Sequence, residues 1–316
     1  MKSVTLRQLR IFASAAKHQS FARAAQEIHV TQPAISMQIK ELEENIGLPL
    51  FDRQGKNLAL TVTGEYFLVY AKRMLATLKE AEDTIARFRG LDSGRVTIGM
   101  VSTATYFLPH LLARFRLEHP NVEFRLSVGN REQLVAQMQA SDVDLSVMGR
   151  PPQEFVARAV PFAAHPLVMV TAVDHPFAKM ESVPAQAFAD QEFILREPGS
   201  GTRAALERWF NEHRIAPPVA MEMTSNETIK QAVMAGMGVS FLSLHTIGLE
   251  LEQHLIAVPR VEGMPVMRRW QLVNLSARNL SPAAEAFRYF LLENGERFLA
   301  ERFAPLMDLP ATRESA

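Results

Sequence analysis

The sequence predicts an α/β protein that carries an all-α part at its N-terminus. Three observations lead to this fold class. Apolar residues recur at helical spacing through the first 60 residues, a second helical pattern runs without a proline from 62 to 89, and strand-like and helix-like segments alternate after residue 91. At 316 residues the chain is long enough for about two domains.

Composition and cysteine content exclude several classes of protein. Apolar residues make up 47% of the chain and charged residues 22%, as in ordinary globular proteins, and no apolar run is long enough to span a membrane. There is no cysteine, which excludes disulfides, thiol nucleophiles and zinc–thiolate sites. The N-terminus lacks the apolar core of a signal peptide. We therefore expect a cytoplasmic protein without a membrane partner.

The formal net charge of zero hides an asymmetry. Residues 1–90 contain 13 Lys and Arg against 9 Asp and Glu, a net of +4, which leaves 21 basic and 25 acidic residues, a net of −4, for the remainder. A basic end predicts a polyanionic partner for that end alone, although an excess of this size also arises by chance.

The N-terminal pattern is that of three short helices. Thr5, Ser20 and Thr31 are placed to cap them, and Gly47 is placed to end the third. Only residues 29–30 separate the second helix from the third, which is the tight turn of a helix-turn-helix motif.

The third helix carries the residues that we expect to read DNA. Its polar face consists of Thr31, Gln32, Pro33, Ser36, Gln38 and Lys40. Helix N-termini and hydroxyl groups suit phosphate, and glutamine reaches base edges in the major groove. The alternative at this point is the solvated face of an ordinary three-helix bundle.

A turn-rich hairpin over 48–58 follows, with Arg53 near its tip, as expected of a wing lying over the DNA backbone. Five motifs occur in order: Leu6-Arg7-Gln8-Leu9, Ser20-Phe21, Gln32-Pro33-Ala34-Ile35-Ser36, Leu50-Phe51-Asp52-Arg53 and Leu60-Thr61-Val62-Thr63-Gly64. This series resembles the LysR-type transcriptional regulators. The resemblance implies a winged helix-turn-helix domain over 1–61 and a double-stranded DNA operator. Met37 departs from the arginine of many members, which puts a polar base contact there in doubt.

Residues 62–90 are predicted to form one long helix. Its apolar residues alternate steps of four and three, namely Phe67, Ala71, Met74, Leu78, Ala81, Ile85 and Phe88. This 3.5-residue period predicts a coiled-coil seam between two chains, and the alternative is a helix packed on its own domain. In the resembled family this linker helix dimerises and spaces two DNA-reading heads, so we expect a homodimer on a pseudo-palindromic operator. A homotetramer is implied by the resemblance alone.

Residues 91–316 are predicted to form two α/β lobes. Strands over 95–100, 122–128 and 143–148 alternate with helices over 106–118 and 131–140, a second series covers about 165–264, and a strand over 267–274 and a helix over 282–302 complete the chain. Such alternation predicts parallel sheets flanked by helices. Because the chain leaves one lobe and returns to it, lobe I is placed at about 91–163 and 267–302, and lobe II at about 164–266. Paired lobes of this kind bind small molecules in the cleft between them.

Loops at this cleft offer hydroxyl groups, a guanidinium and helix N-termini, which together suit an anion. The candidate effector-binding residues are Ser102, Thr103, Gly149, Gly201, Thr202, Arg203, Ser225 and Asn226; Gly149, together with the adjacent Arg150, is the weaker candidate among them. Each loop alone is weak evidence, since such residues at helix starts are usually caps. The resemblance strengthens the case, because family members use the equivalents of Ser102, Thr103, Thr202 and Asn226 in a two-lobed, periplasmic-binding-protein-like effector domain.

Within the family, four segments look most like the regulators of carbon-fixation operons often called CbbR. They are Met100-Val101-Ser102-Thr103, 128–132, 148–152 and 226–243. Such regulators respond to phosphorylated metabolites or NADPH, so the resemblance implies a small anionic effector, no resident cofactor and activation of carbon-fixation genes. RNA polymerase is a further partner under this interpretation.

The sequence has no motif for catalysis or metal binding. Its nine histidines lack metal-ligand spacing, and no Gly-x-Ser-x-Gly elbow occurs, so we expect neither catalytic nor metal-binding residues. The competing hypothesis is a solute-binding module or sugar-phosphate enzyme with a helical appendage. Such a protein would bind its ligand without residues 1–90 and would have no sequence-specific affinity for DNA.

Overall fold

The computed structural model describes residues 4–52, 58–87 and 94–307. The chain divides into two compact units, residues 1–88 and 89–316, and each is described by itself. Arg53, at the tip of the predicted wing, and Phe88, at the end of the predicted seam, lie outside the described residues. Within these ranges no helix combines the length and apolar character needed to cross a membrane.

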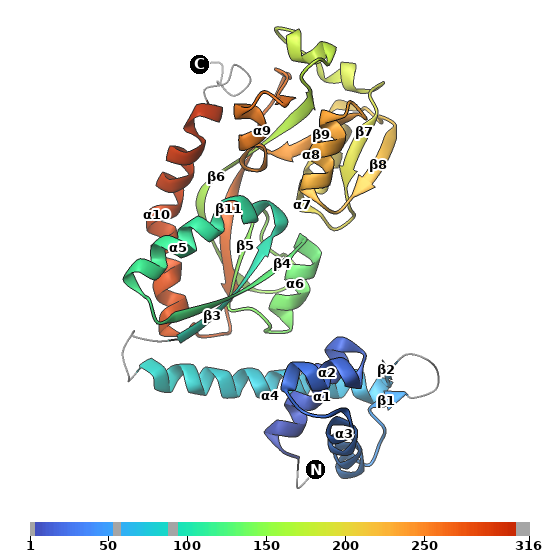
Figure 1. Cartoon of the computed structure of the whole chain (residues 1–316), viewed down its shortest axis with the longest axis vertical. Helices are drawn as coiled ribbons and strands as arrows, with labels where there is room; N and C mark the ends of the chain where they lie inside the picture. Colours follow the sequence, from blue (N-terminus) through green and yellow to red (C-terminus); the bar gives the residue numbers. More distant parts are fainter. Residues whose placement is uncertain (1–3, 53–57, 88–93, 308–316) are drawn as a thin grey trace. The chain divides into compact units, whose positions relative to one another are not determined.

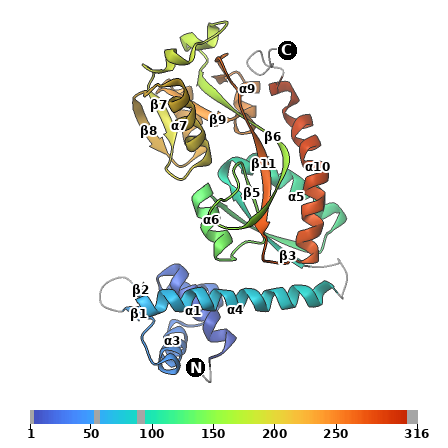
Figure 2. The same cartoon turned by 180° about the vertical axis from the view of Figure 1, so that it is seen from behind.

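The N-terminal unit consists of four helices and a small antiparallel hairpin (Figures 1 and 2). Its elements are α1 (Leu6–His18), α2 (Phe21–Ile28), α3 (Gln32–Ile46), β1 (Phe51–Asp52), β2 (Ala59–Leu60) and α4 (Val62–Arg87).

The predicted boundaries of the three short helices are confirmed, and the caps explain them; the predicted end of the long helix near residue 90 lies outside the described residues. Thr5 accepts a hydrogen bond from the backbone N–H of Gln8 in a capping box, and the side chain of Ser20 accepts one from the backbone N–H of Arg23 at the start of α2. Gly47 ends α3 in the left-handed region at φ +83°. Thr31 stands at the N-cap of α3, but its side chain makes no capping hydrogen bond.

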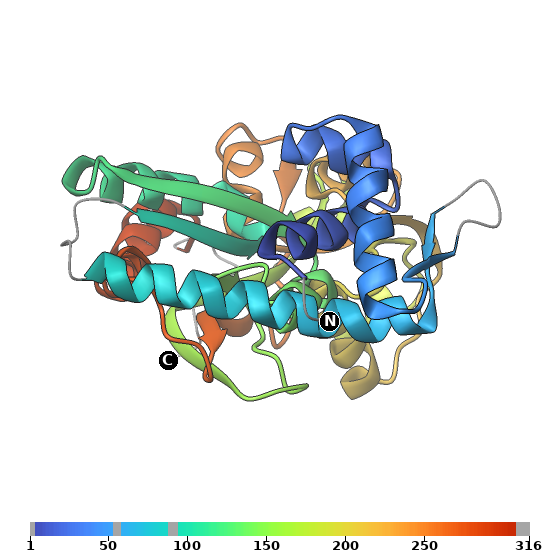
Figure 3. The ribbon, with the colours of Figure 1, turned by 90° about the horizontal axis from the view of Figure 1, so that it is seen from below.

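One apolar core holds the three short helices against α4. Phe12, Ile35, Ile39 and Leu42 are fully buried there, and Ala71 of α4 joins them. Figure 3 shows the short helices gathered beside the first half of α4, while its second half runs on beyond them. The head therefore uses only part of the long helix for its own folding.

The core changes the interpretation of the predicted seam. Phe67 and Ala71 pack inside the head, so for these two positions the alternative, a helix packed on its own domain, is correct. The exposed apolar side chains lie on a neighbouring face, which we call the α4 stripe; its members are Val62, Tyr66, Val69, Tyr70 and Met74, all between 43% and 71% exposed. Sequence periodicity alone does not show which apolar face of a helix packs in the core of its own domain and which face stays exposed.

The C-terminal unit has two lobes joined by two long strands (Figure 1). The first lobe contains β3 (Gly94–Val101), the short 3-10 helix η1 (Ser102–Tyr106), α5 (Leu108–Glu118), β4 (Val122–Gly129), α6 (Arg131–Gln139), β5 (Leu145–Met148) and the C-terminal α10 (Pro282–Met307). The second contains η2 (Pro176–Lys179), η3 (Ala185–Phe188), β7 (Phe193–Arg196), α7 (Gly201–His213), β8 (Val219–Met223), α8 (Asn226–Met234), β9 (Val239–Ser243), η4 (Leu244–Thr246), α9 (Gly248–Glu252) and β10 (Ile256–Ala257). The joining strands are β6 (Ala157–Ala172) and β11 (Val266–Leu275).

A single sheet runs through both lobes in the order β4-β3-β5-β11-β6-β9-β7-β8, with β10 paired to β6. The predicted parallel pairing is correct within each lobe, for β3 with β4 and β5 and for β7 with β8 and β9. It is wrong at the join, where β11 runs antiparallel to β5 and β6, and β6 runs antiparallel to β9. The reason is topological: a strand returning from the second lobe runs opposite to the strand that entered it.

Candidate functional site

The exposed face of α3 is the candidate DNA-reading surface of the head. Thr31, Gln32 and Pro33 are exposed at its N-terminus, and the side chains of Thr31 and Gln32 make no hydrogen bond within the described part of the chain. Ser36 lies one turn further along and is half-buried. Met37 is 56% exposed on the same helix. The exposed side chain at this position is therefore apolar, in place of the arginine with which many family members could make a polar base contact.

Two predicted DNA-reading residues already have partners on α3. Gln38 donates to Oε2 of Glu41 at 2.9 Å, and Lys40 lies 3.8 Å from Oε1 of Glu44. Both contacts are solvent-exposed and weak, so neither side chain is withdrawn from DNA.

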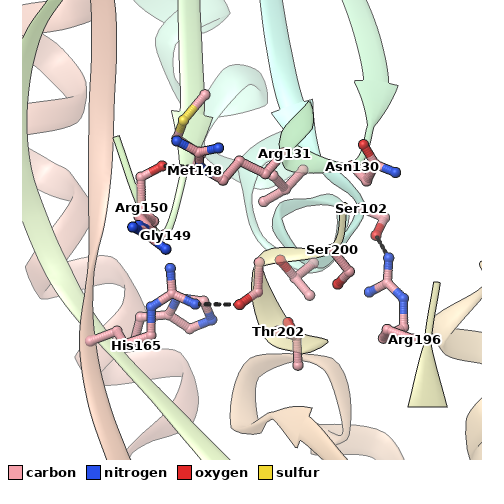
Figure 4. Close-up of a pocket in the computed structure, with 14 residues that line it drawn as sticks. Ser102, Asn130, Arg131, Met148, Gly149, Arg150, His165, Arg196, Ser200 and Thr202 are labelled. Atoms are coloured by element: carbon pink, nitrogen blue, oxygen red, sulfur yellow. Dashed lines mark hydrogen bonds between the residues drawn. The ribbon is translucent and has the colours of Figure 1, made fainter. Parts of the chain in front are cut away.

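A pocket lies between the lobes of the C-terminal unit, at the carboxyl ends of β3, β5 and β7 (Figure 4). Its lining residues are Val101, Ser102, Thr103, Asn130, Arg131, Met148, Gly149, Arg150, His165, Arg196, Ser200, Gly201, Thr202 and Arg268. Its empty space is about 360 Å³, open side included.

Ser102 connects the two lobes across this pocket. Its Oγ accepts hydrogen bonds from Nη2 of Arg196 at 3.1 Å (Figure 4) and from Nδ2 of Asn226 at 3.5 Å. Because both partners donate, the O–H of Ser102 remains available to donate to a ligand. Arg196 is 5% exposed and also donates to Oδ1 of Asn226 at 2.7 Å, so the three side chains hold one another in place.

Two of the arginines around the pocket are balanced by carboxylates. Nε of Arg196 lies 2.8 Å from Oε2 of Glu197, and Nη1 of Arg131 lies 3.0 Å from Oε1 of Glu154. These ion pairs reduce what either guanidinium contributes to the charge of the pocket.

Arg268, on β11, has no carboxylate partner in the described part of the chain. Its Nη1 donates instead to the carbonyl oxygen of Gly201 at 3.0 Å. Burial, and then repulsion from Arg208, Arg150 and Arg131, lowers the pKa of Arg268 to about 10. The guanidinium still carries its charge at pH 7, so the pocket has a partly buried positive charge that no carboxylate of the described residues neutralises.

The structure brings most of the predicted effector residues together. Ser102, Thr103, Gly149, Gly201, Thr202 and the weaker candidate Arg150 line the pocket. Asn226 lies behind this lining and acts on it through Ser102 and Arg196.

Arg203 and Ser225 are not part of the pocket lining. Arg203 turns toward Glu207 and Glu222, at 2.7 and 2.8 Å, and the hydrogen bond that it donates to Glu207 is the main reason why its pKa is raised. Ser225 accepts a hydrogen bond from the backbone N–H of Thr228 and serves as the cap of α8. The helix N-termini at the pocket are therefore those of α6 and α7. The N-terminus of α8 contributes to the pocket only indirectly, through the hydrogen bonds of Asn226.

Several lining residues were not predicted. Arg131 is the first residue of α6, and Ser200 is the N-cap of α7. The sequence predicts both helix starts, so both residues could have been included among the candidates. Arg196, His165 and Arg268 lie on strands, and neither spacing nor composition distinguishes them from other polar strand residues. Among the described residues there is no group of three or more side chains that could hold a metal ion.

A helix-turn-helix head followed by a long helix and a two-lobed unit with a charged pocket defines a ligand-responsive transcription regulator. Residues 6–65 match the family described as bacterial regulatory helix-turn-helix protein, lysR family, and residues 89–296 match the LysR substrate binding domain. The chain belongs to the LysR family of DNA-binding transcriptional regulators. This assignment replaces the competing hypothesis of a solute-binding module or enzyme.

Three known proteins place the chain within the family. The HTH-type transcriptional regulator CfxR of Cupriavidus necator is 46% identical over 97% of each chain. The RuBisCO operon transcriptional regulator of Allochromatium vinosum is 44% identical over 93% of this chain and 97% of that one. The solved regulatory domain of Synechocystis PCC6803 CcmR in complex with 2-PG has a TM-score of 0.62 and 38% identity, over 64% of this chain and 97% of that one.

Proposed function

We propose that this regulator controls carbon-fixation genes, as an activator, in response to a small phosphorylated metabolite bound between its lobes. The observation that carries the effector part is Arg268, a partly buried guanidinium at the pocket with no carboxylate partner among the described residues. Two relatives support the rest: the Allochromatium vinosum protein is a RuBisCO operon regulator, and the CcmR domain binds 2-PG.

The size of the pocket favours a small metabolite over a dinucleotide such as NADPH. About 360 Å³ of empty space, part of it open to solvent, leaves little room for two nucleosides. The predicted effector residues that line it are donors or bare backbone: hydroxyls of Ser102, Thr103 and Thr202, and the glycines Gly149 and Gly201. Such a set suits the oxygen-rich surface of a phosphate.

The effector acts by shifting a population. It contacts both lobes, so it stabilises one angle between them more than another, and only this difference in affinity changes the protein on DNA. Through the exposed N-terminal residues of α3, together with Arg53, the head reads the operator. The α4 stripe is the surface through which two chains form a dimer, and pairs of dimers form the tetramer.

A footprint tests the whole proposal. The purified protein is placed on the intergenic DNA beside its own gene, with and without 2-PG, phosphorylated sugars and NADPH. Protection whose length or bend changes with one phosphorylated compound is the expected result. Protection that ignores every compound would contradict the effector part, and no protection at all would contradict the assigned promoter.

A further inference from the structure

His165 is a buried side chain of the pocket whose hydrogen bonding is incomplete. It lies on β6, is 2% exposed, and its Nε2 is 3.1 Å from Oγ of Ser243 on β9. Its other ring nitrogen, Nδ1, is buried and has no hydrogen-bond partner within the described residues. Leaving a buried polar nitrogen without a partner is unfavourable, so its presence calls for an explanation.

Nδ1 lies close against Gly149. A Cβ atom at position 149 would lie 2.8 Å from Nδ1 of His165 and 3.0 Å from Nη2 of Arg268. Two nitrogens from two adjacent strands thus converge on the bare face of one glycine, and all three residues line the pocket (Figure 4 labels His165 and Gly149).

The surroundings of the ring indicate which nitrogen carries the proton. Burial, with repulsion from His245 and Arg268, holds the pKa of His165 well below its usual value, so the ring is neutral and has one proton. Were Nδ1 an acceptor, the neighbouring guanidinium of Arg268 could donate to it, yet no hydrogen bond joins them. A proton on Nδ1, with Nε2 accepting from the hydroxyl of Ser243, agrees with the hydrogen bond to Ser243 and with the absence of one between Nδ1 and Arg268.

The ring is also held in position before any ligand arrives. It stacks on Trp270 with 3.9 Å between ring centroids and 13° between planes. Trp270 in turn donates from Nε1 to Nδ1 of His245 at 3.0 Å. A donor fixed in this way loses little freedom when it binds, and this is the usual arrangement of a group that selects its ligand.

We propose that His165 is a ligand-binding residue of the pocket, whose Nδ1–H donates to an oxygen of the anionic effector beside Gly149. The proposal rests on the function proposed above and adds a specific recognition element to it. Arg268 supplies charge and His165 supplies a neutral, directional donor beside it. An oxyanion with two or more acceptor oxygens, such as a phosphate, bridges the two.

Asparagine and glutamine variants separate the two ring nitrogens. The amide of asparagine lies near the place of Nδ1, whereas the longer glutamine carries its amide to the place of Nε2. In calorimetric titrations of the full chain with 2-PG and with inorganic phosphate, we expect His165→Asn to bind within about threefold of the wild type. We expect His165→Gln to bind about tenfold more weakly or worse, the loss of a hydrogen bond to a charged group.

Two further readouts keep the test independent of folding. Melting temperatures show whether each variant is folded, and the emission of Trp270, assigned with a Trp209→Phe background, reports ligand at the stacked ring. Imidazole ¹⁵N shifts of the wild type identify the protonated nitrogen without any substitution at 165. A proton on Nε2 in the ligand-bound protein would overturn the proposal.

The outcomes separate this inference from the proposed function. Equal weakening in both variants would make the role of His165 one of packing, and unchanged affinity in both would remove it from the site; either overturns the inference alone. Failure of the wild-type protein to bind any phosphate-bearing probe overturns the proposed effector class, and the inference with it.

Discussion

Gly149 and Gly201 both line the pocket, but only one of them lacks room for a methyl group. A Cβ at 149 would meet Nδ1 of His165 at 2.8 Å, whereas a Cβ at 201 would find Arg268 no closer than 3.8 Å. We expect Gly149→Ala to abolish the response to the effector, because the methyl group would displace His165 and Arg268. Gly201→Ala, the matched control, should retain it. Footprints with and without effector measure both, and a full response in Gly149→Ala would contradict the assignment.

The charge of Arg268 leads to a second prediction. Arg268→Gln removes the guanidinium, which has no carboxylate partner among the described residues, but keeps an amide able to donate to Gly201. We expect the affinity for 2-PG to fall by about tenfold to a hundredfold, as for a lost charge-assisted hydrogen bond. The melting temperature should not fall, because burial and neighbouring arginines already disfavour this charge. Calorimetry and thermal denaturation measure the two effects, and unchanged affinity would remove Arg268 from the site.

At the residue scale, the sequence predicts pocket residues that follow from local rules. Ser102 and Thr202 stand beside helix starts, and Gly149 directly follows a buried strand, so each is visible in a short window. Arg268 and His165 are far apart in sequence and meet only because β11 pairs with β6. No local pattern contains that pairing, and therefore the sequence could not reveal the groups that supply the charge and the neutral donor.

Among the elements, the junction between the hairpin and α4 depends on Gly64. A Cβ there would lie 2.1 Å from the backbone carbonyl oxygen of Leu50, and backbone cannot move aside as a flexible side chain can. We expect Gly64→Ala to destabilise the head by about 1–3 kcal/mol, as overpacking does, and to weaken DNA binding. Gly47→Ala is a useful comparison, since it meets no neighbouring atom and costs only the strain of φ +83°. Thermal unfolding and DNA titration of both variants check the prediction.

The packing of α1 on α2 should depend on pH through Glu27. Burial alone would raise the pKa of Glu27, but hydrogen bonds from Lys17 and Ser14 outweigh it and lower the pKa to about 2. A lowered pKa stabilises the fold above the ordinary value of 4.5, and this contribution is lost as the pH falls from there toward 2.

The matching variant is Glu27→Gln, which keeps the size of the side chain and removes its charge. We expect the difference in melting temperature between wild type and variant to be largest above pH 5 and to shrink as the pH is lowered to 3. A difference that stays constant over this range would show that the ionised carboxylate does not stabilise the head.

Element boundaries were the most predictable part of the fold, because caps and glycines determine them locally. Which face of α4 is buried was less predictable. The 3.5-residue pattern is real, but Phe67 and Ala71 satisfy it by packing in their own head. The prediction of parallel pairing fails at β6 and β11 for a related reason. Alternation of strands and helices reveals their order along the chain, but it does not reveal the direction in which a connecting strand crosses between lobes.

For the molecule as a whole, the α4 stripe leads to a prediction about assembly. Tyr70 is 59% exposed and Met74 43% exposed, and burying such side chains between two chains is favourable. We expect the double variant Tyr70→Glu/Met74→Glu to shift sedimentation toward the monomer and to weaken operator binding about a hundredfold through lost avidity. Glu82→Lys, also on the exposed surface of α4, is the control. An unchanged sedimentation coefficient would place the dimer contact elsewhere.

The connection of the two lobes by β6 and β11 also sets an order of events during synthesis. The head is complete once residue 88 has left the ribosome, whereas the sheet of the first lobe takes β11 from residues 266–275, after the whole second lobe. At about 5–20 residues per second, the roughly 180 residues between these points take some 9–36 seconds to translate. During that interval each nascent chain has a DNA-reading head with no finished sheet in its sensor, and the interval ends only when β11 has been made.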